Sequence, residues 1–287
     1  MAKSEADDKP TVLITGTSTG VGLHTALRFA QAGYAVVATM RDTSKKKALK
    51  DAAKAAGVKI RIDRLDVQSR SSIEGCVKRT LKRYGRIDVL VNNAGAGFLG
   101  SLEQTTDADL KRTMGVNFFG VWNTTKAVFP HMRERGTGRI ISVTSVGGLI
   151  GQPFNEAYCA AKFAVEGMME GFAPLARRMG VAVSLIEPGP INTEFVANVR
   201  AVSAAGLAGF QPPYDGMIAK YMGSSEGVFA QYGQTGDDIA AIILEAAQAE
   251  QPHFRYITSE FAKQIVKPKV AEYTGDAVVE AFAARLQ

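Results

Sequence analysis

The chain has 287 residues, of which 46% are hydrophobic and 22% charged, and its formal net charge at pH 7 is +6. This ordinary globular composition predicts a single domain over residues 11–287, preceded by a flexible N-terminal segment over residues 1–10. The small, dispersed excess of positive charge disfavours a nucleic-acid surface. No stretch approaches the ~18 uninterrupted apolar residues of a membrane span, so we expect no such span.

The start of the chain and its cysteines favour a cytoplasmic location. Residues 1–10 are charged and lack the apolar centre of a signal peptide. Cys76 and Cys159 have no CxxC spacing and no histidine companions, so we expect neither a disulfide framework nor a zinc site. We assign structural or surface roles to the three histidines and expect no bound metal.

Apolar, β-rich runs alternate with helix-length segments through the first two thirds of the chain. The runs cover residues 11–15, 35–39, 60–65, 89–92, 140–143 and 181–186. Strands that are apolar nearly throughout indicate a parallel sheet with both faces covered. We therefore predict an α/β fold with a single doubly wound, Rossmann-like parallel sheet and helices on both faces. A helix from about Asp237 and a short strand near residues 254–257 should follow.

A glycine-rich turn follows the first predicted strand, and an amphipathic run over residues 23–32 follows the turn. Glycines allow the backbone to approach a pyrophosphate, whose charge is favoured by the N–H groups at the start of the next helix. The order of strand, turn and helix predicts a dinucleotide site, although such a turn also occurs as mere structural punctuation. The predicted cradle comprises Gly16, Thr17, Ser18, Thr19, Gly20, Val21 and Gly22.

The end of the second predicted strand bears on which dinucleotide binds. NAD-binding proteins place an acidic residue there for the ribose 2′-hydroxyl, whereas this chain has the sequence Thr39-Met40-Arg41. Arg41 can pair with a 2′-phosphate through a charge-assisted fork, so we predict NADP(H). In the alternative, Arg41 is merely an exposed strand-end residue and Asp42 contacts the ribose.

Tyr158 and Lys162 are candidates for acid/base chemistry. A spacing of four residues places both side chains on one face of a helix, so the ammonium group can lie near the phenol. A neighbouring cation is expected to lower the pKa of a tyrosine from its usual value of ~10, which suits Tyr158 to general acid/base work. A pair with this spacing also occurs by chance on surface helices.

Other motifs in the sequence support a functional role for Tyr158 and Lys162. Ser145 follows the fifth predicted strand, an Asn-Asn-Ala-Gly turn occupies residues 92–95, and Pro188 and Gly189 follow the sixth strand. The carboxyl ends of parallel strands line the ligand crevice of a doubly wound fold, so these segments should meet there. Asn117 lies within a helix-like run.

Together these motifs resemble the short-chain dehydrogenase/reductase family over residues 11–258. The family's glycine motif matches residues 15–22 and its Asn-Asn-Ala-Gly motif matches residues 92–95. The resemblance implies a catalytic tetrad of Asn117, Ser145, Tyr158 and Lys162.

The resemblance also implies individual roles. Asp66 would contact the adenine, Lys162 the nicotinamide ribose, and residues 188–193 the carboxamide. Ser145 would orient the substrate oxygen, and Asn117 would support a proton relay through water. The cofactor-binding residues expected beyond the glycine turn are Arg41, Asp66, Val67, Asn93, Ala94, Gly95, Tyr158, Lys162, Pro188, Gly189, Ile191 and Thr193.

Four further segments resemble the branch of the family that holds 17β-hydroxysteroid dehydrogenase type 1 and photoreceptor retinol dehydrogenase. They are residues 145–149, 153–155, 186–190 and 255–260. The branch implies that the protein is an oxidoreductase that transfers a hydride between NADP(H) and a carbonyl or secondary alcohol.

Residues 190–236 are rich in Gly, Ala, Ser and aromatic residues, and we expect them to form a substrate lid of loops and short helices. An apolar, aromatic lid suits a bulky apolar substrate. The family also implies a homodimer or homotetramer, often formed through the helix that carries Tyr158. Pro174 is expected to kink or end that helix.

Two alternatives share this fold. One is a non-catalytic NADPH-sensing protein, which would not need Asn117, Ser145, Tyr158 and Lys162. The other is a dehydratase or epimerase relative, which would tend to carry a longer C-terminal substrate domain than the 50 or so residues after Gly236.

Overall fold

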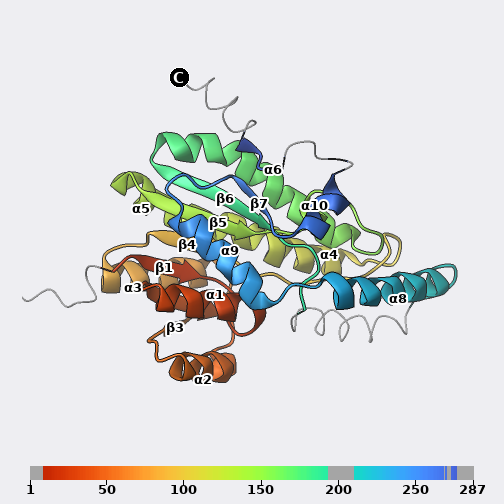
Figure 1. Ribbon diagram of the computed structural model, residues 1–287, viewed down its shortest axis with the longest axis horizontal. Helices are drawn as coiled ribbons and strands as arrows, with labels where there is room; N and C mark the ends of the chain where they lie inside the picture. The colour runs from red at the N-terminus through yellow and green to blue at the C-terminus, as the bar shows by residue number, and fades with distance from the viewer. Residues whose placement is uncertain (1–8, 193–209, 268, 270–272, 277–287) are drawn as a thin grey trace, which may run out of the picture.

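Seven parallel strands form one sheet within residues 9–192, 210–267, 269 and 273–276, the part of the chain that the computed structural model describes (Figure 1). The strand order across the sheet is β3-β2-β1-β4-β5-β6-β7. The strands are β1 (Thr11–Ile14), β2 (Ala35–Met40), β3 (Arg61–Arg64), β4 (Val89–Asn92), β5 (Gly138–Val143), β6 (Val181–Glu187) and β7 (Arg255–Ile257).

Helices connect successive strands. The α-helices are α1 (Gly20–Gln31), α2 (Lys47–Ala55), α3 (Arg70–Tyr84), α4 (Asp107–Met114), α5 (Gly120–Arg135), α6 (Glu156–Arg178), α8 (Tyr214–Tyr232), α9 (Gly236–Gln248) and α10 (Glu260–Val266). Two short 3₁₀ segments, η1 (Thr43–Lys46) and η3 (Val146–Gly148), and one π-helical segment, η2 (Gly115–Phe119), complete the described elements.

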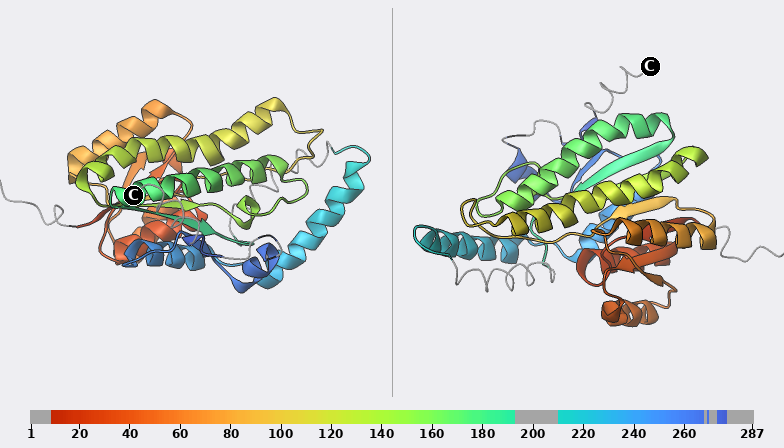
Figure 2. Two further views of the ribbon diagram at one scale, coloured as in Figure 1. Left: turned by 90° about the horizontal axis from the view of Figure 1, so that it is seen from above. Right: turned by 180° about the vertical axis from the view of Figure 1, so that it is seen from behind.

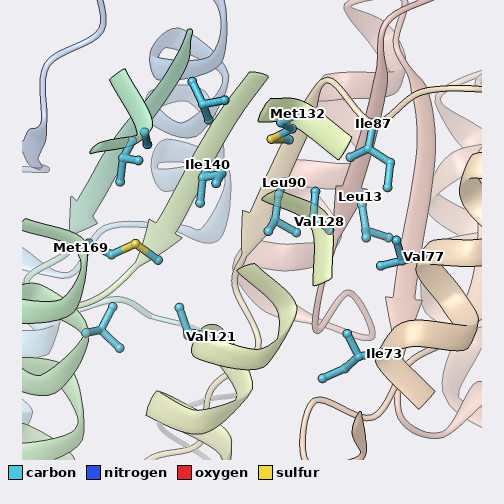
Figure 3. Close-up of a cluster of buried hydrophobic side chains, with 14 of the residues drawn as sticks. Leu13, Ile73, Val77, Ile87, Leu90, Val121, Val128, Met132, Ile140 and Met169 are labelled. Carbon is cyan, nitrogen blue, oxygen red and sulfur yellow. The ribbon is translucent and has the colours of Figure 1, made fainter. Parts of the chain in front are cut away.

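Two helical layers enclose the sheet (Figure 2). On one face, apolar side chains of α3, α5 and α6 pack against apolar side chains of the strands. Figure 3 shows the strand residues Leu13, Leu90 and Ile140 in this cluster. On the other face, α1, α2 and α9 pack against side chains that alternate with these along the strands, such as Val12 and Ile14. The predicted doubly wound sheet is therefore confirmed, and its apolar strands reflect burial on both faces.

The order in which strands are added to the sheet changes direction between β1 and β4. The strands β2 and β3 lie on one side of β1, and β4 to β7 lie on the other. The neighbouring strands β1 and β4 are parallel, with Val12 opposite Val89 and Ile14 opposite Val91. The segment after β1 leads to one face of the sheet and the segment after β4 leads to the other. A crevice is expected at the carboxyl ends of such a pair.

The third strand differs from the apolar strand that we predicted. It is the short sequence Arg-Ile-Asp-Arg at an edge of the sheet. Asp63 accepts hydrogen bonds from Arg79 Nε and Nη2, both at 3.0 Å. Charged residues are tolerated because an edge strand has a neighbour on one side only, and they discourage pairing with other chains.

Pro174 was predicted to kink or end the helix that carries Tyr158, and it does not end that helix. The helix α6 runs from Glu156 to Arg178, with Pro174 buried inside it. Proline removes one hydrogen bond and costs about 3 kcal/mol in a helix interior. Buried contacts of Met169, Ala173 and other residues with the sheet hold the helix across this position.

The predicted lid is not made of short helices alone. Residues 193–209 lie outside the described part of the chain, but α8 is a single helix of 19 residues. Near the base of this segment, Ile191 forms a parallel bridge with Gln234. The helix predicted from about Asp237 is confirmed as α9, which begins with a capping box between Thr235 and Asp238.

Asp88, just before β4, forms hydrogen bonds with residues of β1 and β5 at the end of the sheet opposite the crevice. Its carboxylate accepts hydrogen bonds from the Thr11 amide at 2.7 Å, from Arg86 Nε at 2.7 Å and from Arg135 Nη2 at 2.9 Å. Its own carbonyl accepts one from the Arg139 amide at 2.8 Å. Burial acts to raise the pKa of Asp88, but the hydrogen bonds from Arg86, Thr11 and Arg135 together hold this pKa below its usual value.

We predict that Asp88→Asn lowers the free energy of unfolding at pH 7 by about 2 kcal/mol, because several charge-assisted hydrogen bonds are lost. Urea denaturation measures the change. Since the folded-state pKa of Asp88 is depressed, its contribution is present above the unfolded-state pKa and is lost as pH falls through the folded-state pKa. The difference from wild type should therefore shrink below about pH 4.

Asp51→Asn is the matched control, because that carboxylate is 62% exposed and its partner among the described residues is the exposed Lys47. It should leave the unfolding curve unchanged. An Asp88→Asn curve that overlaid wild type at pH 7 would rule out a stabilising role for Asp88.

Candidate active site

A cavity of about 630 Å³ lies at the carboxyl ends of the central strands. The structure brings most of the predicted site residues together on its wall. They are Gly16, Ser18, Thr19, Gly20, Val21, Gly22, Arg41, Asp66, Val67, Asn93, Ala94, Gly95, Ser145, Tyr158, Lys162, Pro188, Gly189 and Ile191.

The remaining three predicted residues are not among those lining the cavity. Thr17 is fully buried, and its hydroxyl donates to the Thr39 carbonyl at 3.1 Å. Asn117 is also fully buried behind the wall. Thr193 lies outside the described residues.

Gly16 and Gly22 lie where the turn after β1 touches the loop after β4. Gly16 has a φ of 72°, and a Cβ added there would lie 2.7 Å from the Ala94 Cα. A Cβ added at Gly22 would lie 2.2 Å from the Gly16 carbonyl oxygen and 2.4 Å from Asn93 Nδ2. Asn93 Nδ2 donates to the carbonyls of Thr15 and Gly16, each at 2.9 Å. The contact is possible only because glycine has no side chain.

The N-terminus of α1 borders the cavity without a side-chain cap. The hydroxyl of its N-cap residue, Thr19, makes no capping hydrogen bond, whereas α3, α4, α9 and α10 each begin with a Ser or Thr hydroxyl that accepts one. The first N–H groups of α1 are therefore left for another acceptor, and the helix dipole favours an anion there. Together with the close backbone approach in the turn, this fits a dinucleotide pyrophosphate.

Arg41 and Asp42 take different positions after β2. Arg41 is exposed and lines the cavity. The carboxylate of Asp42 instead accepts a hydrogen bond from the Ser44 amide at 2.9 Å, which caps η1. Asp42 is not among the residues that line the cavity.

The hydroxyl groups of Tyr158 and Ser145 meet on the cavity wall. Tyr158 lies in the first turn of α6, and Ser145 is the N-cap of η3, directly after β5. The interaction with the Ser145 hydroxyl acts to lower the pKa of Tyr158. A Cβ added to Gly147 would lie 3.4 Å from both Ser145 Oγ and Tyr158 Cε1. Both hydroxyls are thus close enough to reach one substrate oxygen.

Burial favours the uncharged forms of both Tyr158 and Lys162. It raises the pKa of Tyr158 to about 12, although the interaction with Ser145 opposes it. It lowers the pKa of Lys162 to about 8, although the charge of Glu166 opposes it. The expectation that Lys162 lowers the pKa of Tyr158 is therefore not met in this structure. Lys162 Nζ lies 5.7 Å from the centre of the Tyr158 ring and donates to the Val143 carbonyl at 3.0 Å.

Asn117 supports the wall from behind. It lies in the π-helical segment η2, between α4 and α5. Its side chain accepts a hydrogen bond from the Ala96 amide at 3.1 Å and donates to the carbonyls of Ala96 at 2.8 Å and Thr113 at 3.0 Å. A Cβ added at Gly95 would lie 3.0 Å from Asn117 Oδ1 and 3.7 Å from Lys162 Nζ. Asn117, Gly95 and Lys162 are therefore neighbours.

The half of the cavity away from the glycine-rich turn is largely apolar, and only part of its lining could be predicted from the sequence. Its apolar and aromatic lining comprises Phe98, Leu99, Tyr221, Met222, Val228, Phe229, Phe261 and Ile265. Polar exceptions include Gln152 and Asn155, of which Asn155 Nδ2 donates to the Tyr221 hydroxyl at 2.9 Å. The aromatic composition of residues 190–236 pointed to the residues of α8, but no periodic signal marked those of the loop after β4 or of α10.

Within the described residues, no group of His, Cys, Asp and Glu side chains is arranged to hold a metal ion. In the same part of the chain, none of the helices combines the length and apolar character needed to cross a membrane.

Comparisons with known proteins agree with this geometry. The family model described as short chain dehydrogenase matches residues 10–204. The chain is 38% identical over 280 residues to retinol dehydrogenase 8 of Bos taurus, covering 96% of this chain and 89% of that protein. It is 36% identical over 277 residues to 17-beta-hydroxysteroid dehydrogenase type 1 of Homo sapiens, covering 94% and 84%.

A solved structure shows the same architecture with a nicotinamide cofactor. It is a short chain dehydrogenase/reductase from Burkholderia phymatum in complex with NAD, with a TM-score of 0.78 and 25% sequence identity, covering 92% of this chain and 94% of that one.

We predict that Gly22→Ala weakens dinucleotide binding by about tenfold or more and lowers the free energy of unfolding by about 1–3 kcal/mol, because the added methyl group overpacks the contact between the turn and Asn93. Cofactor fluorescence titration and urea denaturation measure the two effects. Gly216→Ala in α8 is the control, since a Cβ there meets no atom within 4 Å. Equal affinity in the Gly22 variant and wild type would contradict the proposed cradle.

Proposed function

The chain belongs to the short-chain dehydrogenase family, whose members are oxidoreductases that act on alcohols and ketones, and on this premise we propose that it transfers a hydride between NADP(H) and a carbonyl or secondary alcohol. The observation that carries the proposal is the closeness of the Tyr158 and Ser145 side chains on the wall of a cavity that the glycine-rich turn also lines. A sensor that binds NADPH without catalysis would need no such pair.

The proposed roles follow from the positions of the side chains. Ser145 orients the substrate oxygen, and Tyr158 donates a proton to it during reduction. With a pKa of about 12, Tyr158 starts in the protonated form that reduction requires. The ammonium of Lys162 lies on the same side of α6, where it stabilises the phenolate that remains after proton donation. A bound nicotinamide cofactor supplies the hydride.

The preference for NADP(H) rests on Arg41. The Arg41 side chain lines the cavity at the end of β2, where no carboxylate would repel a 2′-phosphate. The competing ribose ligand, Asp42, is already used as the cap of η1. Solved structures of the family contain either NAD or NADP. The preference between the two cofactors is therefore expected to depend on residues such as Arg41 and Asp42 and not on the fold.

A bulky apolar ketone or secondary alcohol is the proposed substrate. The half of the cavity beyond Tyr158 is lined by aromatic and aliphatic side chains from three separate segments, represented by Phe98, Tyr221 and Phe261. The names of two similar proteins, a retinol dehydrogenase and a hydroxysteroid dehydrogenase, support the same substrate class. Residues 190–236 form the proposed lid, of which α8 supplies the described part.

The proposal includes a homodimer or homotetramer in the cytoplasm. The helices α5 and α6 lie side by side on one face of the molecule (Figure 2). Large apolar side chains are exposed on or next to them, with exposed fractions of 52% for Phe119, 47% for Trp122 and 46% for Leu175. Contact between copies through this face would cover them. The described cysteines are free, which suits a reducing compartment.

We predict that Tyr158→Phe lowers kcat/KM for ketone reduction by about 10²–10⁴-fold, because the proton donor is lost while the ring that packs is kept. The dissociation constant for NADPH should change little. NADPH absorbance with a panel of steroid, retinoid and aromatic carbonyl substrates measures the activity, and NADPH fluorescence measures binding.

Tyr84→Phe on the remote helix α3 provides a matched loss of a hydroxyl group and should behave as wild type. Activity of the Tyr158 variant within about tenfold of wild type would remove Tyr158 from the acid/base role.

We also predict that Arg41→Leu weakens NADPH binding by about ten- to a hundredfold and leaves NADH binding nearly unchanged, because only NADPH has the 2′-phosphate. Met40→Asp combined with Arg41→Leu should reverse the preference toward NADH, since the new carboxylate repels the phosphate and accepts the free ribose hydroxyl. The ratio of kcat/KM for the two cofactors is the measurement, at one ionic strength. Lys46→Leu, an exposed residue outside the cavity wall, is the control for a general loss of charge.

Equal losses for both cofactors in the Arg41 variant would show that Arg41 is not the phosphate reader. A wild-type preference for NADH would overturn the proposed cofactor and leave the proposed reaction type intact.

A further inference from the structure

Three buried titratable side chains meet where α6, β6 and β7 lie side by side (Figure 1). They are Glu166, Glu187 and Arg255, whose side chains are 6%, 0% and 8% exposed. Arg255 Nη1 donates to Glu166 Oε2 and, at 2.6 Å, to Glu187 Oε1. The other terminal nitrogen of Arg255, Nη2, donates at 2.7 Å to Glu170, which is 37% exposed.

One guanidinium can balance only one of the two buried carboxyl groups, and an uncompensated buried charge is strongly unfavourable. Burial raises the pKa of Glu187 well above its usual value, and the neighbouring charge of Glu166 raises it further. Burial also raises the pKa of Glu166, but the charge of Arg255 opposes this effect. The pKa of Glu187 is therefore the more strongly raised of the two, and we assign the proton to Glu187 and the single negative charge to Glu166.

The position of that charge matters because of Lys162. Glu166 follows Lys162 by four residues, so both side chains lie on one face of α6. Lys162 is 5% exposed, and the charge of Glu166 opposes the effect of burial on its pKa.

The charged and titratable groups around this pair can be traced through the described elements. Those facing Glu166 are Lys162 on its own helix, Glu187 at the end of β6 and Arg255 on β7, with Glu170 on the outer side of Arg255. Lys162 faces Tyr158 and Glu166.

We propose that Glu166 is a positioning residue of the active site, whose charge, held in place by Arg255 and by the proton on Glu187, keeps the buried side chain of Lys162 in its ammonium form. Glu166 touches neither substrate nor cofactor and acts through Lys162 alone. The inference depends on the proposed function only for the consequence of that charge in turnover.

The direct test is the titration of Lys162, followed by ¹³C NMR of the full-length protein labelled at lysine Cε, with the signal assigned by its loss in Lys162→Met. The wild-type midpoint is expected at about pH 8. Glu166→Gln should lower it by about one pH unit or more, because a neighbouring negative charge is lost. Glu166→Asp, which keeps the charge, should recover most of the difference.

Two control variants separate charge from structure. Glu187→Gln replaces a group that is already neutral, and Glu170→Gln removes a charge on the outer side of Arg255. Neither should move the Lys162 midpoint. An unchanged midpoint in Glu166→Gln, or an equal shift in Glu187→Gln, would overturn the inference.

Stability gives a second readout. The single variants Glu166→Gln and Glu187→Gln should both fold, because one of the two buried carboxyl groups remains to ionise beside Arg255. The double variant Glu166→Gln with Glu187→Gln leaves only the half-exposed Glu170, so its urea midpoint should fall by more than the sum of the two single changes. If the changes in urea midpoint were additive, the idea that Glu166 and Glu187 share a single negative charge would be wrong.

Kinetics distinguish this inference from the proposed function. At saturating NADPH, the alkaline limb of kcat/KM for ketone reduction should move to lower pH in Glu166→Gln and stay in place in Glu170→Gln. If the NMR midpoint moves while the kinetic limb does not, the charge on Glu166 is upheld and the role proposed for Lys162 in turnover is wrong.

Discussion

The close approach between the turn after β1 and the loop after β4 is the constraint on which the cavity depends. The Thr15 hydroxyl accepts hydrogen bonds from the amides of Asn93 and Ala94, each at 3.0 Å, while Asn93 returns two hydrogen bonds to the turn. At Gly16 and Gly22 the backbone leaves no space for a methyl group. Because α1 starts inside this turn, the direction of its uncapped N-terminus follows from the same contact.

The two ends of the cavity differ in the charge that they favour. At α1 and Arg41, free N–H donors, the helix dipole and a guanidinium all favour an anion. At α6, burial favours the neutral forms of both Tyr158 and Lys162. In the proposed reaction, proton transfer from Tyr158 leaves a phenolate in this second region, and a nearby cation stabilises it. The side chain of Lys162 can supply that cation only if another group offsets its own burial, and Glu166 is placed one helical turn away.

The sheet and the position of the glycine-rich turn on the cavity wall could be predicted because both depend on short sequence segments. Burial on both faces leaves a continuous apolar run at most strands, and the glycine turn lies within eight residues of β1. The prediction failed where long-range contacts override local preference. Packing against the sheet carries α6 through Pro174, and the edge position admits charged residues in β3. The pKa of Tyr158 could not be predicted either, because it depends mainly on the burial of its side chain, which only the tertiary structure sets.

The substrate is harder to predict from the sequence than the fold, because the apolar half of the cavity also depends on long-range contacts. Phe98, Tyr221 and Phe261 line one space although more than 160 positions of chain separate the first from the last. Their common orientation follows from tertiary contacts, such as the hydrogen bond from Asn155 to Tyr221 and the stacking of Tyr232 on Phe261, whose ring centres are 4.0 Å apart. A change in any of these contacts would reshape the apolar half without disturbing the glycine turn. Selectivity can therefore vary among proteins that share the cofactor site, so a shared cofactor motif constrains the reaction type more tightly than the substrate.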